Sequence, residues 1–187
     1  SGEPAIRLAV RQAMRIMGGQ YVLGRTIEEA AKRGRKENRP ETRFSFDMLG
    51  EGARTLADAA QYFRAYMEAI EKIGQNHDQN HDRNHEKGNG KGDVYAAHGI
   101  SVKFSALHPR YEFAQAEMVM TDMYPKIREL AVAARARGLG FTIDAEEADR
   151  LDISLDIFEA LAREPQLADW DGLGIVVQAY QKRAPYV

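Results

Sequence analysis

The sequence contains no cysteine and only one tryptophan among its 187 residues. The lack of thiols excludes a cysteine nucleophile, a disulfide framework, an iron–sulfur centre and a cysteine-ligated metal, so redox chemistry here would require an added cofactor. Long hydrophobic runs are also missing, and Arg7, Arg11 and Arg15 interrupt the first apolar segment. These features predict neither a signal peptide nor a membrane-spanning helix, and we expect a cytoplasmic protein.

A strong excess of either charge is absent too, because 26 basic residues face 28 acidic ones. The first 40 residues nevertheless hold nine Lys or Arg against four Asp or Glu. Apolar residues recur beside them at helical spacing, at Ile6, Val10, Met14 and Met17. This pattern predicts an amphipathic helix with a solvated basic face, and no nucleic-acid interface in this segment. A second helix is predicted over 27–36, with Thr26 as N-cap and Glu29 at the capping-box position, so 1–42 form a predicted N-terminal helical segment.

From Arg43 onward, short strand-like runs alternate with longer segments of helical periodicity. The strand-like runs are 44–49, 99–104, 139–145 and 173–180. Strand–helix alternation requires right-handed crossovers and hence a parallel sheet. No Gly-x-Gly-x-x-Gly motif follows any of these strands, so a dinucleotide-binding sheet has no support. We therefore predict an α/β protein of the TIM-like β/α barrel class, in which 43–187 form the first four βα units.

The intervening helices carry their own start and stop signals. Thr55 with Asp58 three residues later predicts the start of the first helix, and Gly74 its end. The second helix is predicted to end at Gly138. Buried faces are expected from residues that recur at helical spacing: Tyr124, Ile127, Leu130 and Ala134 in the second helix, and Ile153, Ile157 and Leu161 in the third.

Each predicted strand carries a polar side chain at or near its carboxyl end: Asp47, Lys103, Asp144 and Gln178. Burying an unpaired polar group costs a few kcal/mol, so polar groups at equivalent strand positions indicate a shared polar site. In a β/α barrel this end of the strands forms the active-site face. The alternative is an Asp–Lys ion pair with a purely structural role.

Residues 75–93 differ in composition from the rest of the chain. Here His77, His81 and His85 follow one another at intervals of four, a spacing that would align three imidazoles on a helix and could ligate zinc or nickel. Several asparagines and glycines disfavour a helix, however. We predict a flexible, low-complexity surface insertion at 75–93 and no dedicated metal site.

Four motifs match a known family in order along the chain. They are Phe-Ser-Phe-Asp-Met-Leu-Gly-Glu at 44–51, Gly-Ile-Ser-Val-Lys-Phe-Ser-Ala-Leu-His-Pro-Arg-Tyr at 99–111, Ile-Asp-Ala-Glu-Glu-Ala-Asp-Arg at 143–150 and Val-Gln-Ala-Tyr-Gln-Lys-Arg at 177–183. Together they resemble the proline dehydrogenase domain of the bifunctional proline utilization A flavoenzymes of bacteria. The resemblance implies an FAD-containing barrel that oxidises L-proline to Δ1-pyrroline-5-carboxylate by hydride transfer to flavin N5. It also implies a membrane quinone as electron acceptor, and therefore a peripheral position at the inner membrane.

The resemblance assigns roles to particular residues at the strand ends. Lys103, Asp144 and Asp47 are the implied catalytic residues, and Lys103 would hold the proline carboxylate. The implied contacts are Lys103, Asp47 and Met48 to proline, and Asp144, Ala145, Val176 and Gln178 to the flavin.

A barrel of the family continues through four further strands, which carry other parts of the flavin and proline sites. Eight βα units need about 250 residues, so we expect this chain to be a partial catalytic domain that is inactive alone. The remaining half of the barrel and an aldehyde dehydrogenase module are expected in the parent polypeptide. Two alternatives stay open: a non-catalytic half-barrel that pairs with a partner half through its sheet edges, and a barrel enzyme in which Lys103 forms a Schiff base.

Overall fold

The computed structural model describes residues 2–37, 42–48, 50, 52–84 and 94–187. The chain divides into two compact units, Ser1–Thr42 and Arg43–Val187. Each unit has its own internal packing.

The first unit consists of two helices, α1 (Glu3–Tyr21) and α2 (Ile27–Glu37). The predicted N-cap of α2 is confirmed, because the Thr26 hydroxyl accepts a hydrogen bond from the Glu29 N–H at 3.3 Å. The Arg33 guanidinium donates to the carbonyls of Val22 and Gly19, which lie at the end of α1 where carbonyls lack helical partners. The predicted apolar stripe of α1 is 51–68% exposed at Ile6, Val10, Met14 and Met17.

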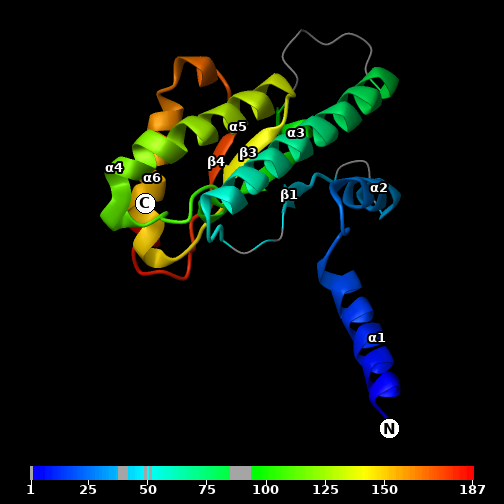
Figure 1. The fold of residues 1–187 in the computed structure, drawn as a ribbon. Helices are drawn as coiled ribbons and strands as arrows, with labels where there is room; N and C mark the ends of the chain where they lie inside the picture. Colours follow the sequence, from blue (N-terminus) through cyan, green and yellow to red (C-terminus); the bar gives the residue numbers. More distant parts are fainter. Residues whose placement is uncertain (1, 38–41, 49, 51, 85–93) are drawn as a thin grey trace. The chain divides into compact units, whose positions relative to one another are not determined.

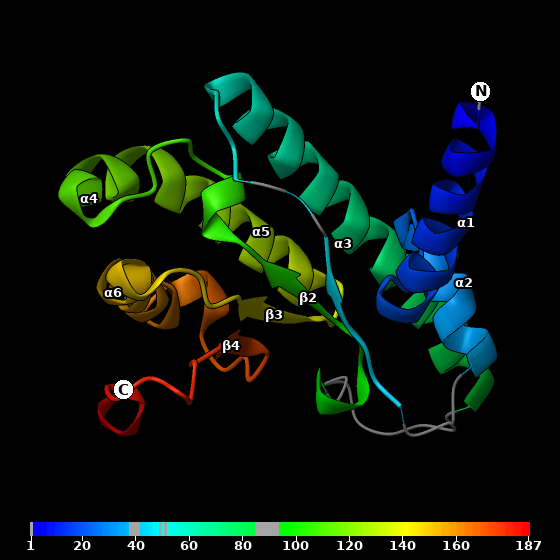
Figure 2. The ribbon, with the colours of Figure 1, turned by 90° about the horizontal axis from the view of Figure 1, so that it is seen from below.

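The second unit contains a parallel sheet of four strands in the order β1-β2-β3-β4 (Figure 2). The strands are β1 (Ser45–Asp47), β2 (Gly99–Val102), β3 (Gly140–Ile143) and β4 (Leu173–Ile175), each shorter than the predicted run. The order contains no reversal, whereas the strand order of a doubly wound sheet reverses at its switch point. The predicted α/β class and parallel sheet are confirmed.

Three long helices connect the strands: α3 (Leu56–Asn84), α5 (Tyr124–Ala136) and α6 (Leu151–Ala162). Right-handed crossovers that always advance in one direction place their helices on one face of the sheet. Accordingly α3 and α5 pack side by side (Figure 1). A short helix α4 (Ala116–Met118) and a π-helical turn (Val119–Met123) precede α5. Single 3-10 turns lie at Val94–Ala96, Phe104–Ala106, Phe113–Gln115, Ala148–Arg150, Pro165–Leu167 and Ala184–Tyr186.

The core lies between these helices and one face of the sheet. Apolar strand residues with no exposed surface form its floor: Ile100, Val102, Phe141 and Ile143. The predicted helix faces are confirmed as fully buried at Ile127, Leu130, Ala134, Ile153, Ile157 and Leu161, while Tyr124 is only partly buried. Each such isoleucine or leucine stabilises the fold by about 2 kcal/mol relative to an exposed side chain. Gly138 has φ +66° just beyond α5, a conformation that favours glycine and ends the helix as predicted.

Helix α3 begins as predicted but ends later. The Thr55 hydroxyl accepts from the Asp58 N–H at 3.1 Å and Asp58 Oδ2 accepts from the Thr55 N–H at 2.9 Å, a reciprocal cap. The predicted end at Gly74 is wrong, since the helix continues to Asn84. Gly74 instead permits close packing, because a Cβ there would lie 2.8 Å from Cβ of Arg137, whose guanidinium pairs with Glu71.

The predicted insertion at 75–93 is only partly described. The backbone of residues 75–84 is helical, contrary to the prediction that the asparagines of this stretch disfavour a helix. Helical geometry there continues from the packed part of α3, which has already passed the costly nucleation step. Residues 85–93, with His85, lie outside the described residues.

Candidate active site

The carboxyl edge of the sheet gathers the charged residues of the first three strands. Ser101 pairs with Asp47 on one side and with Thr142 on the other. Side chains alternate between faces along a strand, so Lys103 and Asp144, two residues after Ser101 and Thr142, point to the same face as Asp47. This is the face opposite the buried Ile100 and Phe141.

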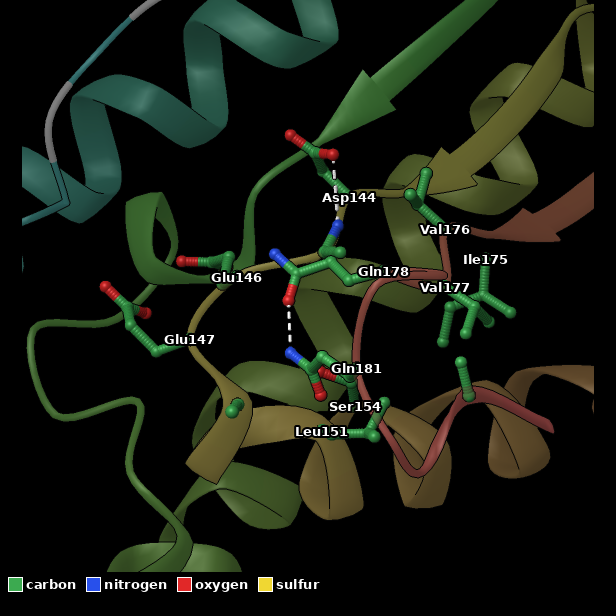
Figure 3. Close-up of a pocket in the computed structure, with 13 residues that line it drawn as sticks. Asp144, Glu146, Glu147, Leu151, Ser154, Ile175, Val176, Val177, Gln178 and Gln181 are labelled. Atoms are coloured by element: carbon green, nitrogen blue, oxygen red, sulfur yellow. Dashed lines mark hydrogen bonds between the residues drawn. The ribbon is translucent and has the colours of Figure 1, made fainter. Parts of the chain in front are cut away.

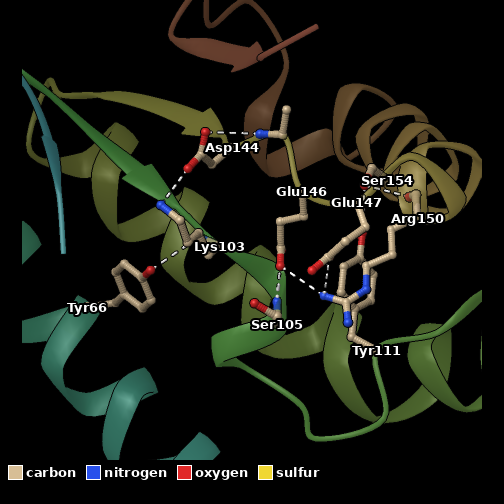
Figure 4. Close-up of polar contacts among 10 residues, drawn as sticks. Tyr66, Lys103, Ser105, Tyr111, Asp144, Glu146, Glu147, Arg150 and Ser154 are labelled. Atoms are coloured by element: carbon tan, nitrogen blue, oxygen red, sulfur yellow. Dashed lines mark hydrogen bonds and ion pairs between the residues drawn. The ribbon is translucent and has the colours of Figure 1, made fainter. Parts of the chain in front are cut away.

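Lys103 joins the two carboxylates directly. Its Nζ donates to Asp47 Oδ2 at 2.8 Å. The same Nζ lies 2.5 Å from Asp144 Oδ2 (Figure 4). The second oxygen of Asp144, Oδ1, accepts from the Ala145 N–H at 3.0 Å. The three charged side chains are 25–34% exposed, so the cluster is half-buried and open to a small solute.

The environment keeps Lys103 positively charged. Partial burial alone would lower the pKa of its ammonium group, but hydrogen bonds and charge from Asp144 and Asp47 outweigh burial and raise this pKa above its usual value. An ammonium between two carboxylates leaves the cluster with an excess of negative charge when both are ionised. The cluster therefore offers both a cation and an anion to a solute.

Tyr66 fixes the backbone at Lys103. Its hydroxyl, at the inner face of α3, accepts a hydrogen bond from the Lys103 N–H at 3.1 Å (Figure 4). Burial raises the pKa of Tyr66 to about 12, against the smaller opposing effect of this hydrogen bond, so the phenol stays neutral. Sequence reasoning did not assign Tyr66 to the site, since no local pattern reveals its contact with β2.

A second set of contacts lies beyond the ion pair. Glu146, two residues after Asp144, accepts hydrogen bonds from the Ser105 N–H and from Arg150, each at 3.0 Å. The Arg150 guanidinium carbon lies 5.3 Å from the centre of the Tyr111 ring, and Tyr111 Oη lies 2.6 Å from Ser154 Oγ (Figure 4). Sequence reasoning did not assign these residues to the site, although Glu146 and Arg150 belong to a motif that it quoted.

Two pockets open at this edge. The first lies between the ends of β3 and β4 and brings together the predicted flavin residues Asp144, Ala145, Val176 and Gln178 (Figure 3). The second is lined by Lys103, Ala145 and Gln178 among others. The Gln178 amide oxygen accepts from Gln181 Nε2 at 2.5 Å, which orients the amide within the first pocket. Met48 follows Asp47 at the end of β1 and lines neither pocket.

In the part of the chain that the structure describes, no group of three or more His, Asp or Glu side chains is arranged to hold a metal ion. No helix among the described residues is long and apolar enough to cross a bilayer.

A parallel sheet with helices on one face and a charged, pocketed carboxyl edge is the arrangement found in α/β barrel enzymes. The chain belongs to the proline dehydrogenase family, because the family model described as proline dehydrogenase matches residues 30–187. The resemblance seen in the four motifs is thereby confirmed.

Individual relatives agree with this assignment. The chain is 51% identical over 187 residues to the bifunctional protein PutA of Klebsiella aerogenes and 46% identical over 186 residues to that of Rhizobium meliloti. These alignments cover the whole chain but only 13% and 14% of the relatives. A solved proline utilization A of Bradyrhizobium japonicum matches 99% of the chain and 18% of its own length, with 51% identity and a TM-score of 0.73. The proline utilization A of Bdellovibrio bacteriovorus has a TM-score of 0.82 at 22% identity over 96% of the chain and 19% of its own length, a likeness of fold.

Proposed function

We propose that this chain forms the first half of the barrel of an FAD-dependent proline dehydrogenase, which oxidises L-proline to Δ1-pyrroline-5-carboxylate. One observation carries the proposal: Lys103 is held as a cation between Asp47 and Asp144 at the carboxyl edge of a sheet of this family. The edge is where parallel α/β barrels place their chemistry.

The charges of the cluster suit a cyclic amino acid. Proline carries a carboxylate and a secondary amine that is protonated at neutral pH. The Lys103 ammonium can pair with that carboxylate through a charge-assisted hydrogen bond, and the excess carboxylate attracts the ammonium of the substrate. Asp47, with Met48 beside it at the end of β1, would face the ring. Lys103, Asp47 and Asp144 would thus orient proline without forming a covalent bond to it.

The residues that line the first pocket could form one wall of the site for the isoalloxazine ring of a flavin, while the cavity itself, about 20 Å³, is too small to enclose the ring. Val176 is 39% exposed and presents apolar surface beside Ala145, as a flat aromatic ring requires. Gln178 supplies a neutral amide for hydrogen bonds to the polar edge of the ring. A bound flavin would supply the hydride acceptor, N5, and pass electrons on to a membrane quinone. The residues of the chain contribute orientation and shelter from water.

The remaining half of the barrel would complete this site. Within the described residues, β1 and β4 each pair with one neighbour only, and both edges of the sheet are left for further strands. We propose that these strands, and an aldehyde dehydrogenase module, belong to the same longer polypeptide. The complete protein would act in the cytoplasm as a peripheral protein of the inner membrane. Unless the second half pairs with these edges, the chain would be a non-catalytic half-barrel.

A Schiff-base function for Lys103 is less well supported. A lysine nucleophile must lose its proton, and such lysines have a lowered pKa. Asp144 and Asp47 instead raise the pKa of Lys103. The two functions separate in one assay, because borohydride would trap a carbonyl substrate on a Schiff-base lysine but leave no adduct on a lysine that only pairs with a carboxylate.

The decisive experiment uses the complete polypeptide that carries this chain. Its visible spectrum is recorded, and L-proline is then added without oxygen. We expect the absorption bands of bound oxidised flavin, followed by their bleaching on addition of proline. A complete polypeptide that binds no flavin, or whose flavin absorption is unchanged by proline, would overturn the proposed function.

A further inference from the structure

We propose that Glu146, which lines both pockets, is a positioning residue: through its hydrogen bond to the Ser105 N–H it holds Lys103 at the distance from Asp144 that proline binding requires. This inference rests on the proposed function. It adds to that function a residue that acts through the hydrogen-bonded backbone beyond the ion pair.

The backbone of Ser105, which follows β2, makes hydrogen bonds to the segments that follow β1 and β3. Its N–H donates to Glu146, which follows β3, at 3.0 Å. Its carbonyl accepts from the N–H of Ala53, in the segment after β1, at 2.8 Å. Ser105 itself lies two residues after Lys103. Glu146 therefore ties the segment that carries Lys103 to the segment that carries Asp144.

Glu146 is also held firmly itself. Its side chain is only 8% exposed, and Arg150 donates to its second oxygen, Oε2, at 3.0 Å. Arg150 in turn lies over the ring of Tyr111, a cation–π contact in a largely buried place. The Ser154 hydroxyl donates to the Arg150 carbonyl at 2.9 Å, so its oxygen is left to accept from Tyr111 at 2.6 Å. These contacts fix the Glu146 carboxylate relative to α6.

The loss of the Glu146 carboxylate would change the position of Lys103. Without Glu146 the Ser105 N–H loses its acceptor, and a half-buried donor without a partner is costly. The segment 103–105 is then free to move away from β3. A displacement of about 1 Å at a substrate-orienting group can change binding and rate by one to two orders of magnitude.

The neighbouring residue provides a matched control. Glu147 also pairs with Arg150, at 3.0 Å, yet its side chain is 66% exposed and it makes no described bond to Ser105. Glu146→Ala and Glu147→Ala each remove one carboxylate and one ion pair to the same arginine. Only Glu146→Ala removes the hydrogen bond to the Ser105 N–H, which links the segments after β2 and β3.

Two measurements on the complete polypeptide test the proposal. Hydrogen exchange of the peptide that covers 103–107 reports the Ser105 tie directly. The dissociation constant of tetrahydrofuran-2-carboxylate, an analogue with the carboxylate of proline but no amine, reports Lys103. We expect Glu146→Ala to raise the exchange rate and the dissociation constant about tenfold each, and Glu147→Ala to change both less than about twofold. Glu146→Gln, which keeps an oxygen for the Ser105 N–H, should restore most of the exchange protection.

A double-mutant cycle separates positioning from general destabilisation. If Glu146 acts through Lys103, its substitution adds little to the dissociation constant once Lys103→Met has removed the ammonium. Equal effects of Glu146→Ala and Glu147→Ala, or full additivity with Lys103→Met, would overturn the positioning role. If the unmodified polypeptide neither binds the analogue nor is reduced by proline, the proposed function fails and the positioning role with it, while the exchange data still report the Ser105 tie.

Discussion

The helix-covered face of the sheet and its carboxyl edge are built from the same four strands but held together differently. On the face, Ile100, Phe141 and Ile143 are fully buried against apolar helix residues. At the edge, Lys103, Asp47 and Asp144 are held by directional bonds between charged groups that remain partly exposed. We therefore expect the face to determine whether the unit folds and the edge to determine what it binds.

The energies of the two regions differ in kind. Burial of apolar area is non-directional and adds up over many residues. A partly exposed ion pair contributes little to stability but can contribute strongly to binding a charged solute, because the solute completes its hydrogen bonds. Substitutions in the two regions should therefore separate stability from substrate affinity.

The largest effect is expected on the face. Phe141→Ala removes a fully buried ring. It should lower the free energy of opening, that is, of the unfolding that exposes the strand amides to hydrogen exchange, by about 3–5 kcal/mol. Phe113→Ala is the matched control, because Phe113 is 58% exposed and its loss should change this energy by less than about 0.5 kcal/mol. Hydrogen exchange of strand amides in the complete polypeptide measures both. Similar losses in the two variants would show that the face is not the source of stability.

At the edge, Lys103→Met should raise the KM for proline on the order of a hundredfold, the cost of losing a hydrogen bond between charged groups. The free energy of opening should change by less than about 1 kcal/mol, since the side chain is 28% exposed. Steady-state kinetics measures KM, and hydrogen exchange of the strand amides measures the stability. Lys72→Met in α3 is a control for the loss of a lysine. An unchanged KM would remove Lys103 from the proline site.

The fold could be predicted because its signals are local. Strand–helix alternation, the Thr55–Asp58 cap and the face of Ile153, Ile157 and Leu161 all depend on residues within a few positions of one another. Gly74 shows where this fails: a glycine signals both a helix end and close packing, and the choice between them depends on Arg137, 63 positions away.

The site could be predicted in part for a different reason. Parallel strands end at the same edge, so polar residues at Asp47, Lys103 and Asp144 had to meet. The supporting residues gave no such signal. Glu146 and Glu147 are identical in type and adjacent in the chain, and only the packed structure buries one and exposes the other.

A smaller effect is expected where the face and the edge meet. Tyr66→Phe keeps the buried ring but removes the acceptor of the Lys103 N–H. We expect the free energy of opening to fall by about 1 kcal/mol and the KM for proline to rise about threefold, because the N–H loses its partner while the ammonium remains. Tyr62→Phe, one turn earlier in α3, is the control. A rise in KM without any loss of stability would assign Tyr66 to the edge alone.

The smallest effect concerns pH, because we expect the affinity for a carboxylate ligand to stay the same from neutral to weakly basic pH. Because the two carboxylates raise the pKa of Lys103 above its usual 10.5, whatever the ion pair adds to stability or binding is fully present below that value. It is lost only as the pH rises through the higher pKa of the folded state. The dissociation constant of tetrahydrofuran-2-carboxylate, which has no amine to titrate, should therefore stay constant from about pH 7 to about pH 10. Asp144→Asn removes the acceptor that raises this pKa most, and affinity should then begin to fall at a lower pH than in the unmodified protein. If the two proteins lose affinity at the same pH, Asp144 does not hold the charge on Lys103. The charged side chains at the edge then do not act as a coupled cluster.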